Sequence, residues 1–378
     1  MKKVVVLGAG MVGAVMARDL SEDSRFTVAI ADINEQNLEK ASRKGNIQII
    51  KADLSRPDEV KRLVRDFDLV CGALSSHIGF SVLRAVIESG KDYCDISFMP
   101  EDATKLDSLA KEKGVTVVVD CGVAPGMSNM LCGYANSYFD QTESIEIYVG
   151  GLPVVRTLPY EYKAAFSPAD VIEEYTRPSR FIVDGKIVTK PALSDPELMD
   201  FPGIGTLEAF NTDGLRSLLK TIKAPRIVEK TLRYPGHIEL MRVLRETGFF
   251  NKDAIDISGV KISPLELTSK LLFKMWKYED GEEDLTVMRV IADGMKNGKS
   301  ARLAWDLLDR YDPVHNETSM SRTTAFPNAI VARMVVSGEY KNPGVNPPEF
   351  IGRNKKLLDK ILDELLKRGV KFENNSTL

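Results

Sequence analysis

The chain has 378 residues, enough for two domains, and its 43% apolar and 28% charged residues are typical of a globular protein. Its 51 basic and 54 acidic residues give a net charge of −3, without the basic excess of proteins that bind nucleic acid or anionic membranes. Four single cysteines fit no disulfide framework, and no uncharged apolar stretch reaches about 18 residues, so we expect a cytoplasmic protein without a membrane span.

Residues 1–122 alternate between strand-like and helix-like segments with short connections. β-Branched runs such as KVVVLG, FTVAIAD and VTVVVD are separated by amphipathic stretches such as RPDEVKRLVRDF. This alternation is typical of a doubly wound parallel sheet with right-handed crossovers, and six strands match a dinucleotide-binding domain. The sequence therefore predicts an α/β fold whose first domain, residues 1–122, is of the Rossmann type.

The turn after the first strand carries the motif G-x-G-x-x-G as Gly8, Gly10 and Gly13. The first glycine permits a tight turn, the second lets the backbone approach a pyrophosphate, and the third allows close packing of helix on strand. Phosphates would lie at the N-terminus of the following helix, where free N–H groups and the helix dipole favour anions. Met11 and Val12, which begin that helix, are therefore predicted contacts as well.

Asp32 ends the second strand-like run, where an acid accepts hydrogen bonds from the ribose hydroxyls and repels a 2′-phosphate. No arginine or lysine directly follows, since Ile33 and Asn34 come next, so we predict NAD rather than NADP. Ile33 is included as a neighbouring contact. The ends of the third and fourth strands add three positional candidates for the nucleotide: Asp53, Leu54 and Leu74.

After about residue 140 the pattern changes to strands that are joined by hairpins. The run DLTVMRVIADGMKNGKSARLAWDLLDRY contains two strands and a glycine-containing loop, which predicts an antiparallel pair. Helical stretches such as GHIELMRVLRET intervene, so we expect residues 123–342 to form a second, α+β domain. The tail, residues 343–378, carries a helix with an apolar stripe, and we expect it to pack back on the first domain.

The sequence predicts neither a metal site nor a serine nucleophile. His77, His237 and His315 are isolated, without H-x-x-x-H spacing, and no G-x-S-x-G motif is present. Beside a nicotinamide cofactor, this leaves the oxidation of an alcohol or an amine, assisted by acid–base groups.

The polar candidates for such chemistry are Asp120, Glu208, Asp213, Arg216, Arg233 and His237. Arg216 and Arg233 suit an α-carboxylate, because the guanidinium fork binds a carboxylate through two parallel hydrogen bonds. Glu208 or Asp213 would hold the α-ammonium. His237 is the predicted proton acceptor, with Asp120 as its rival. Two simpler alternatives stay open: an intramolecular ion pair for Arg216, and a capping or core role for His237.

Five stretches together resemble the saccharopine dehydrogenase and lysine 6-dehydrogenase family: DCGVAPG, YVGGLP, FSPADVIEEYTRP, EAFNTDGLRS and TLRYPGH. The pattern is most similar to that of archaeal-type L-lysine 6-dehydrogenases. The resemblance implies a nucleotide-binding domain, a substrate domain that also carries a dimer contact, and hence a homodimer. It further implies that Ser97, Gly122 and Ser167 contact the nucleotide, and that Thr231 and Arg233 contact the substrate.

The chain departs from the glutamate-forming saccharopine dehydrogenases at several polar positions. Their L-D-P-G is VAPG at residues 123–126, a tyrosine is replaced by Phe98, and a cysteine by Val149. Their N-R-D-S is NTDG at residues 211–214, so a substrate-binding arginine is missing and Arg216 would supply its charge. Each departure removes a polar group that a dicarboxylic amino-acid adduct would use, so we expect a smaller substrate, with Phe98 among its contacts.

The resulting prediction is an L-lysine 6-dehydrogenase that oxidises the ε-amine of L-lysine with NAD. Its products would be ammonia and 2-aminoadipate 6-semialdehyde, which closes to a cyclic imine. A saccharopine dehydrogenase, or a related enzyme of reductive amination, is the alternative within the same chemistry. A non-catalytic regulator that binds NAD is the alternative from another class.

Overall fold

The computed structural model describes residues 1–164 and 168–377, and the chain divides into two compact units. The first unit contains Met1–Tyr134 and Ser321–Lys371, and the second contains Ala135–Met320 together with the segment that begins at Phe372. Within the described ranges, no helix combines the length and the apolar character that a bilayer crossing requires.

The first unit is built on a seven-stranded sheet in which every pair of neighbours is parallel. In sheet order the strands are β17 (Gly344–Asn346), β6 (Thr116–Val118), β5 (Asp92–Asp95), β4 (Leu69–Gly72), β1 (Lys2–Leu7), β2 (Phe26–Asp32) and β3 (Ile47–Lys51). The order reverses between β1 and β4, which is the switch point at which open α/β sheets bind ligands. The predicted α/β class and its doubly wound parallel sheet are confirmed.

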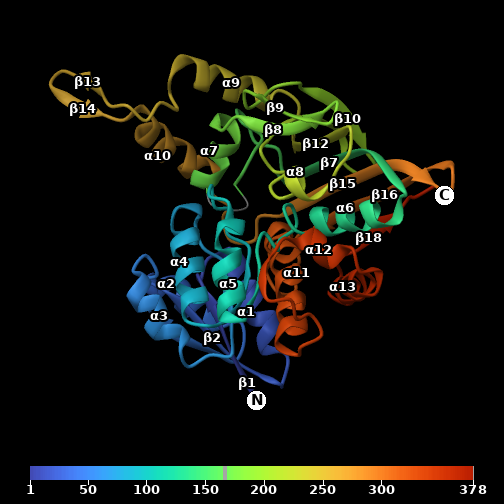
Figure 1. Ribbon diagram of the computed structural model, residues 1–378. Helices are drawn as coiled ribbons and strands as arrows, with labels where there is room; N and C mark the ends of the chain where they lie inside the picture. Colours follow the sequence, from blue (N-terminus) through green and yellow to red (C-terminus); the bar gives the residue numbers. More distant parts are fainter. Residues whose placement is uncertain (165–167, 378) are drawn as a thin grey trace. The chain divides into compact units, whose positions relative to one another are not determined.

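Helices connect successive strands of this sheet (Figure 1). They are α1 (Met11–Ser21), α2 (Glu35–Ser42), α3 (Pro57–Val64), α4 (Ser76–Glu88) and α5 (Asp107–Lys113), the last preceded by the 3₁₀ turn η1 (Ala103–Leu106). Apolar faces of α3 and α4, with Val60, Val64 and Val86, pack on strand residues such as Val70 and Val117 to form one buried cluster. The strands themselves are buried along most of their length, as expected of a parallel sheet covered on its faces.

The first unit extends further than the predicted boundary at residue 122. It includes most of α6 (Met127–Tyr138) and of α11 (Ser319–Val336). It also includes the whole of α12 (Pro348–Gly352) and α13 (Lys355–Lys367). Close contacts explain why α6 stays with this unit, because a Cβ atom at Gly133 would lie 2.2 Å from the backbone oxygen of Glu349. A Cβ atom at Gly352 would likewise lie 1.9 Å from the backbone oxygen of Met130. Residues 321–342, predicted for the second domain, are therefore part of the first.

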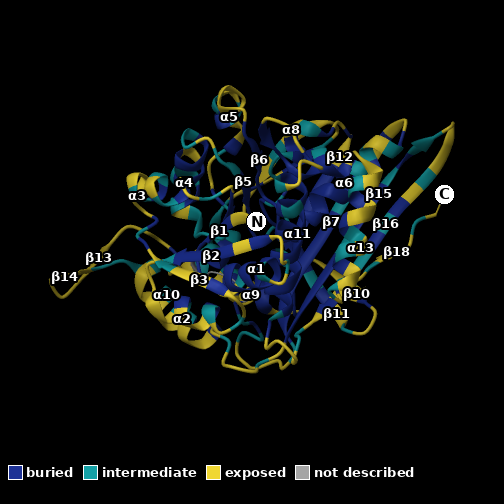
Figure 2. Cartoon of the chain, turned by 90° about the horizontal axis from the view of Figure 1, so that it is seen from below, coloured by how far each residue is buried: buried dark blue, intermediate teal, exposed yellow. Residues whose placement is uncertain are grey.

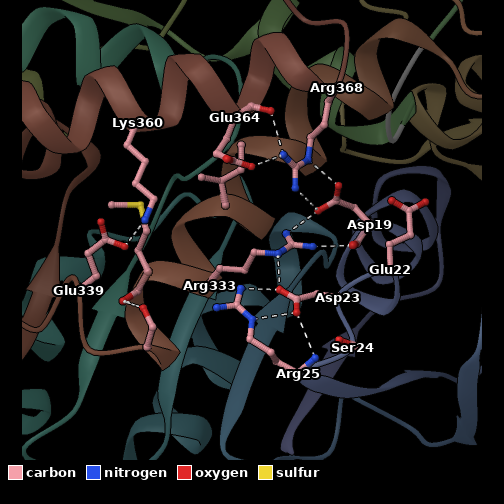
Figure 3. A pocket seen from close by; sticks show the side chains of 13 residues that line it. Asp19, Glu22, Asp23, Ser24, Arg25, Arg333, Glu339, Lys360, Glu364 and Arg368 are labelled. Atoms are coloured by element: carbon pink, nitrogen blue, oxygen red, sulfur yellow. Dashed lines mark hydrogen bonds and ion pairs between the residues drawn. The ribbon is translucent and has the colours of Figure 1, made fainter.

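Ion pairs fasten α11 and the end of α13 to α1. The carboxylate of Asp19 accepts hydrogen bonds from Arg333 Nη1 at 2.5 Å and from Arg368 Nε at 2.6 Å, as Figure 3 shows. Arg333 Nη2 also donates to the backbone oxygen of Asp19 at 2.6 Å. On α13, three residues of the predicted apolar stripe are buried, namely Leu358, Ile361 and Leu365. The helix of the tail therefore packs on the first unit through polar and apolar contacts, whereas the end of the tail, from Phe372 on, belongs to the second unit, contrary to the prediction.

The second unit is built on a mixed nine-stranded sheet. Its main path runs β10 (Glu197–Phe201), β11 (Gly205–Asn211), β12 (Arg226–Arg233), β7 (Gln141–Pro153), β15 (Asp284–Lys296), β16 (Lys299–Arg310) and β18 (Phe372–Asn374). Strand β8 (Ser179–Val183) pairs with β12 and with β9 (Lys186–Lys190). The pair β12–β7 is parallel, whereas β15 and β16 form the predicted antiparallel hairpin.

Alternation along β11 places residues on opposite faces of this sheet. Phe210 contributes to an apolar cluster with residues of α7 (Pro168–Thr176), α9 (His237–Thr247) and α10 (Pro264–Trp276), whereas Leu207 and Ala209 join a second cluster. The short helix α8 (Leu218–Thr221) precedes β12. A small hairpin of β13 (Ile255–Ile257) and β14 (Val260–Ile262) precedes α10 and is exposed, as Figure 2 shows.

Candidate functional site

The glycine motif of the first unit adopts the geometry of a phosphate-binding turn. Gly8 has φ +102°, and a Cβ atom there would lie 2.2 Å from the backbone oxygen of Ala73. A Cβ atom at Gly13 would lie 2.0 Å from the backbone oxygen of Gly8, so the helix approaches the turn as closely as the motif requires. At Gly10, by contrast, a Cβ atom would meet nothing within 4 Å, which leaves open space in front of the N-terminus of α1.

Asp32 lies beside this turn, at the end of β2. Its Oδ2 accepts a hydrogen bond from the backbone N–H of Ala9 at 2.6 Å, and its Oδ1 accepts one from Asn34 N–H at 2.8 Å. Two backbone donors thus fix the carboxylate next to the glycine motif. The turn, the helix end and the acid together fit a bound dinucleotide, with the pyrophosphate at α1 and a ribose at Asp32.

The other predicted nucleotide contacts fall into three groups. Met11 and Ile33 are exposed and Val12 is partly buried, at the same edge as the turn. Asp53 accepts hydrogen bonds from Ser55, and Leu54 is buried. Ser97 Oγ accepts a hydrogen bond from Leu74 N–H at 3.2 Å, so those two candidates are in contact. Ser167 lies outside the described residues.

A buried carboxyl group that the sequence did not single out holds Ser97 in place. Asp95 ends β5, and its Oδ1 accepts hydrogen bonds from Ser97 Oγ at 2.7 Å and from Ser97 N–H at 3.1 Å. Burial raises the pKa of Asp95 to about 6. Asp120, with φ +51°, and Gly122 lie in the buried loop after β6 and belong to the same unit, as does the half-buried Phe98.

His237 of the second unit has both ring nitrogens engaged. Nδ1 lies 2.9 Å from the backbone oxygen of Tyr160, and because a carbonyl can only accept, Nδ1 carries the proton. Nε2 therefore accepts a hydrogen bond from the hydroxyl of Tyr175 at 2.9 Å. Burial, reinforced by the positive charge of Arg233, lowers the pKa of His237 to about 3. His237 is consequently neutral, and its lone pair faces Tyr175.

Arg233 ends β12 and is surrounded by the same residues. Its Nε donates to Tyr175 Oη at 3.3 Å, its Nη2 to Glu174 Oε2 at 2.6 Å, and its Nη1 to the backbone oxygen of Leu232 at 2.9 Å. The guanidinium carbon also lies 4.5 Å from the ring centre of Tyr162, a cation–π distance. Burial raises the pKa of Glu174, although Arg233 opposes that shift, and it raises the pKa of Tyr175 to about 12.

A second polar group continues along the same face of β12. Glu229, Thr231 and Arg233 alternate along the strand and so share one face. Glu229 Oε2 accepts hydrogen bonds from Thr212 Oγ1 at 2.6 Å and from Gly214 N–H at 3.1 Å. Thr212 Oγ1 also lies 2.9 Å from Thr231 Oγ1. We call Tyr175, Glu174, Arg233, Glu229, Thr212, Thr231 and His237 the polar cluster.

The remaining substrate candidates have intramolecular partners. Asp213 accepts hydrogen bonds from Arg180 Nε at 2.9 Å and Nη2 at 2.8 Å, so its carboxylate is part of an ion pair. Glu208 Oε2 accepts a hydrogen bond from the backbone N–H of Gly236, the residue before α9. Arg216 is partly buried and has φ +53°. The structure therefore gathers the predicted substrate residues Arg233 and Thr231 with the predicted proton acceptor His237.

Two family models match the chain. The saccharopine dehydrogenase NADP binding domain matches residues 4–118, and the saccharopine dehydrogenase C-terminal domain matches residues 122–370. The first model is named for NADP, whereas the predicted cofactor is NAD. The matches therefore support a dinucleotide-binding domain without supporting the choice of NAD.

Several curated proteins are similar over most or all of the chain. Mitochondrial alpha-aminoadipic semialdehyde synthase of Mus musculus is 24% identical over 100% of this chain and 48% of its own length, so the chain spans about half of such relatives. Saccharopine dehydrogenase [NADP(+), L-glutamate-forming] of Saccharomyces cerevisiae is 22% identical over 96% of this chain and 97% of its own. Carboxyaminopropylagmatine dehydrogenase of Synechocystis is 24% identical over 91% of this chain and 92% of its own length.

The fold also matches a solved structure. Apo saccharopine dehydrogenase (L-Glu forming) from Saccharomyces cerevisiae superimposes with a TM-score of 0.83 at 20% identity, over 100% of both chains. The likeness confirms a Rossmann-like domain joined to a second, C-terminal domain.

Proposed function

Because the chain belongs to the saccharopine dehydrogenase family, we propose that it is a dinucleotide-dependent dehydrogenase that oxidises a carbon–nitrogen bond of an amino acid. Two features of the chain support this proposal. The first unit carries the glycine turn and the fixed carboxylate of Asp32, and the second carries the polar cluster. The homodimer that the resemblance implies stays a prediction.

The balance of charge in the polar cluster supports L-lysine as the substrate. The cluster contains two acids, Glu174 and Glu229, and one guanidinium, that of Arg233, which is already bonded to Glu174. An excess of acid suits a substrate with a cationic end better than it suits the several carboxylates of saccharopine. The specific proposal is therefore oxidative deamination of the ε-amine of L-lysine. Saccharopine is the second candidate, which the names of the yeast relatives favour.

The chemistry sets one requirement for the protein. A hydride leaves the ε-carbon only if the neighbouring nitrogen is neutral, whereas a free lysine amine has a pKa of about 10.4. The protein must therefore remove a proton from the ammonium, by a base or by a desolvating pocket. A bound nicotinamide supplies the acceptor of the hydride. Water then adds to the substrate iminium, and ammonia leaves.

The predicted proton acceptors are constrained differently by their surroundings. His237 Nε2 accepts its hydrogen bond from Tyr175, so it would take a proton only through that hydroxyl or after Tyr175 had moved away. Asp120 belongs to the first unit and is buried in the loop that precedes α6. Both residues stay predictions as proton acceptors.

The cofactor would be NAD, because Asp32 presents a fixed negative charge where the 2′-phosphate of NADP would lie. Replacing Asp32 by alanine is expected to weaken NADH binding roughly 10-fold, the loss of one hydrogen bond to a charged group, and to narrow the preference for NADH over NADPH. Fluorescence titration with both reduced cofactors measures the change. Glu35→Ala, in the first turn of the neighbouring α2, is the control. An unchanged preference would show that the ribose is bound elsewhere.

The proposed substrate is tested by mixing the protein with NAD and L-lysine at alkaline pH while NADH absorbance and ammonia are followed together. NADH and ammonia in equal amounts are expected. NADH from saccharopine, without any from lysine, would assign the second candidate. Tight NADH binding without turnover of either compound would support the non-catalytic regulator.

A further inference from the structure

Glu229 is a carboxyl group in the interior of the second unit, on a strand flanked by β11 and β7. Its residue is only 6% exposed. Thr212 and Gly214 are the partners of its side chain, both bonded to Oε2, and within residues 1–164 and 168–377 the structure gives the carboxylate no cation. A buried acid without a cation is costly unless it is protonated or meets a positive charge from a ligand.

The neighbouring charges do not neutralise Glu229. Glu174 of α7 is bonded to Arg233, and Asp213, in the loop after β11, is bonded to Arg180. The charges of Glu174 and Asp213 both oppose ionisation of Glu229, and burial opposes it most, so the pKa of Glu229 is raised to about 7. Each acid beside Glu229 thus has its own arginine, while Glu229 has hydroxyl and amide donors only.

The sequence around Glu229 is adapted to this carboxyl group. A Cβ atom at Gly214 would lie 2.5 Å from Glu229 Cδ, so a larger residue at 214 would collide with the carboxyl group. The hydroxyl of Thr212 donates a hydrogen bond to its Oε2 at 2.6 Å. Thr212 and Gly214 therefore act together to accommodate an acid on this face of the sheet.

We propose that Glu229 receives the terminal ammonium of the substrate and takes one of its protons, an inference that rests on the proposed oxidation of a lysine-like amine. In this step an N–H bond of the ammonium breaks and an O–H bond forms on Glu229. The electron pair left on nitrogen then forms the C=N bond as a hydride leaves the ε-carbon. A carboxyl group that titrates near neutral pH is suited to this transfer, because it can hold the proton and release it again.

The first test compares two ligands that differ only in the terminal ammonium. L-Lysine carries it, whereas L-norleucine has the same four side-chain carbons with a hydrogen atom in place of the ammonium. With NADH present, so that no oxidation takes place, calorimetry is expected to show that the protein binds lysine roughly 10- to 100-fold more tightly, the size of one charge-assisted hydrogen bond. Glu229→Gln is expected to remove this difference while leaving norleucine binding unchanged.

The matched control is Glu146→Gln. Glu146 lies on the neighbouring β7, where it forms an ion pair with Arg226 and faces the opposite side of the sheet. The Glu146→Gln variant should therefore prefer lysine over norleucine as strongly as the parent does. Equal losses for lysine and norleucine in Glu229→Gln would overturn the inference, since Glu229 would then contact a part common to both. A preference for lysine over norleucine that Glu229→Gln retains would overturn the inference as well. A third outcome separates the two proposals. If Glu229→Gln loses the preference for lysine over norleucine but the parent does not oxidise lysine, Glu229 is still the ammonium site and only the proposed reaction is refuted.

A second measurement needs no ligand. Because the folded-state pKa of Glu229 lies above its unfolded value of about 4.5, ionisation destabilises the folded protein, and stability falls as pH rises from about 4.5 through 7. Glu229→Gln lacks this contribution, so its unfolding midpoint should match the parent at pH 4.5 and exceed it at pH 8. A variant that is less stable than the parent by the same amount at both pH values would show that Glu229 only holds the loop at residues 212–214.

Discussion

Replacing Asp19 by alanine is expected to lower the free energy of unfolding by about 3 to 5 kcal/mol, the cost of breaking a buried ion pair by removing one partner. The side chain of Asp19 is only 3% exposed, and those of Arg333 and Arg368 are 14% and 17% exposed. Without the carboxylate, two guanidinium groups lose their buried partner at once (Figure 3). Glu364 and Asp23 would still contact them, so the variant should remain folded.

Urea unfolding followed by circular dichroism measures this effect. Asp359→Ala is the control, because Asp359 lies on α13 in an exposed pair with Lys355, which is worth less than about 1 kcal/mol. If Asp19→Ala is no more costly than Asp359→Ala, the ion pairs do not hold α11 and α13 to α1.

The elements that the sequence predicted well are those whose pattern is local. The glycine turn and Asp32 lie within one β–α–β segment, so spacing alone placed Asp32 beside the turn. The hairpin of β15 and β16 is equally local. The unit boundaries could not be predicted in this way, because residues far apart in the chain decide them. Asp19 meets Arg333 across more than 300 residues, and Gly133 meets Glu349 across more than 200.

The polar cluster, too, could be predicted only where its residues are close together in the sequence. Arg233 and His237 were predicted from one short stretch, and the structure places them around the hydroxyl of Tyr175. Tyr175 and Glu174 were missed because they come from α7, about 60 residues earlier in the chain. For Glu229 a signal was available, since the alternation of Glu229, Thr231 and Arg233 placed an acid on the same strand face as a candidate arginine. A strand at the centre of a sheet rarely carries a charge without a reason.

Arg233 combines a structural with a predicted substrate-binding role, and two variants can separate them. Arg233→Met alone is expected to lower the free energy of unfolding by about 3 kcal/mol at pH 8, because Glu174 is left mostly buried without its cation. Lowering the pH should reduce this cost, since burial raises the pKa of Glu174 and the acid then becomes protonated. The double variant Glu174→Gln, Arg233→Met removes both charges and is expected to lie within about 1 kcal/mol of the parent.

Turnover is expected to behave differently from stability in these variants. If Arg233 holds the α-carboxylate of the substrate, the double variant stays roughly 100-fold or more below the parent in kcat/KM, because restoring the fold does not restore the guanidinium. Urea unfolding and NADH formation from the proposed substrate give the two readouts on the same preparations. Recovery of both stability and kcat/KM in the double variant would assign Arg233 to the fold alone. The carboxylate of the substrate would then have to be bound by another cation, for which Arg216 is the predicted candidate.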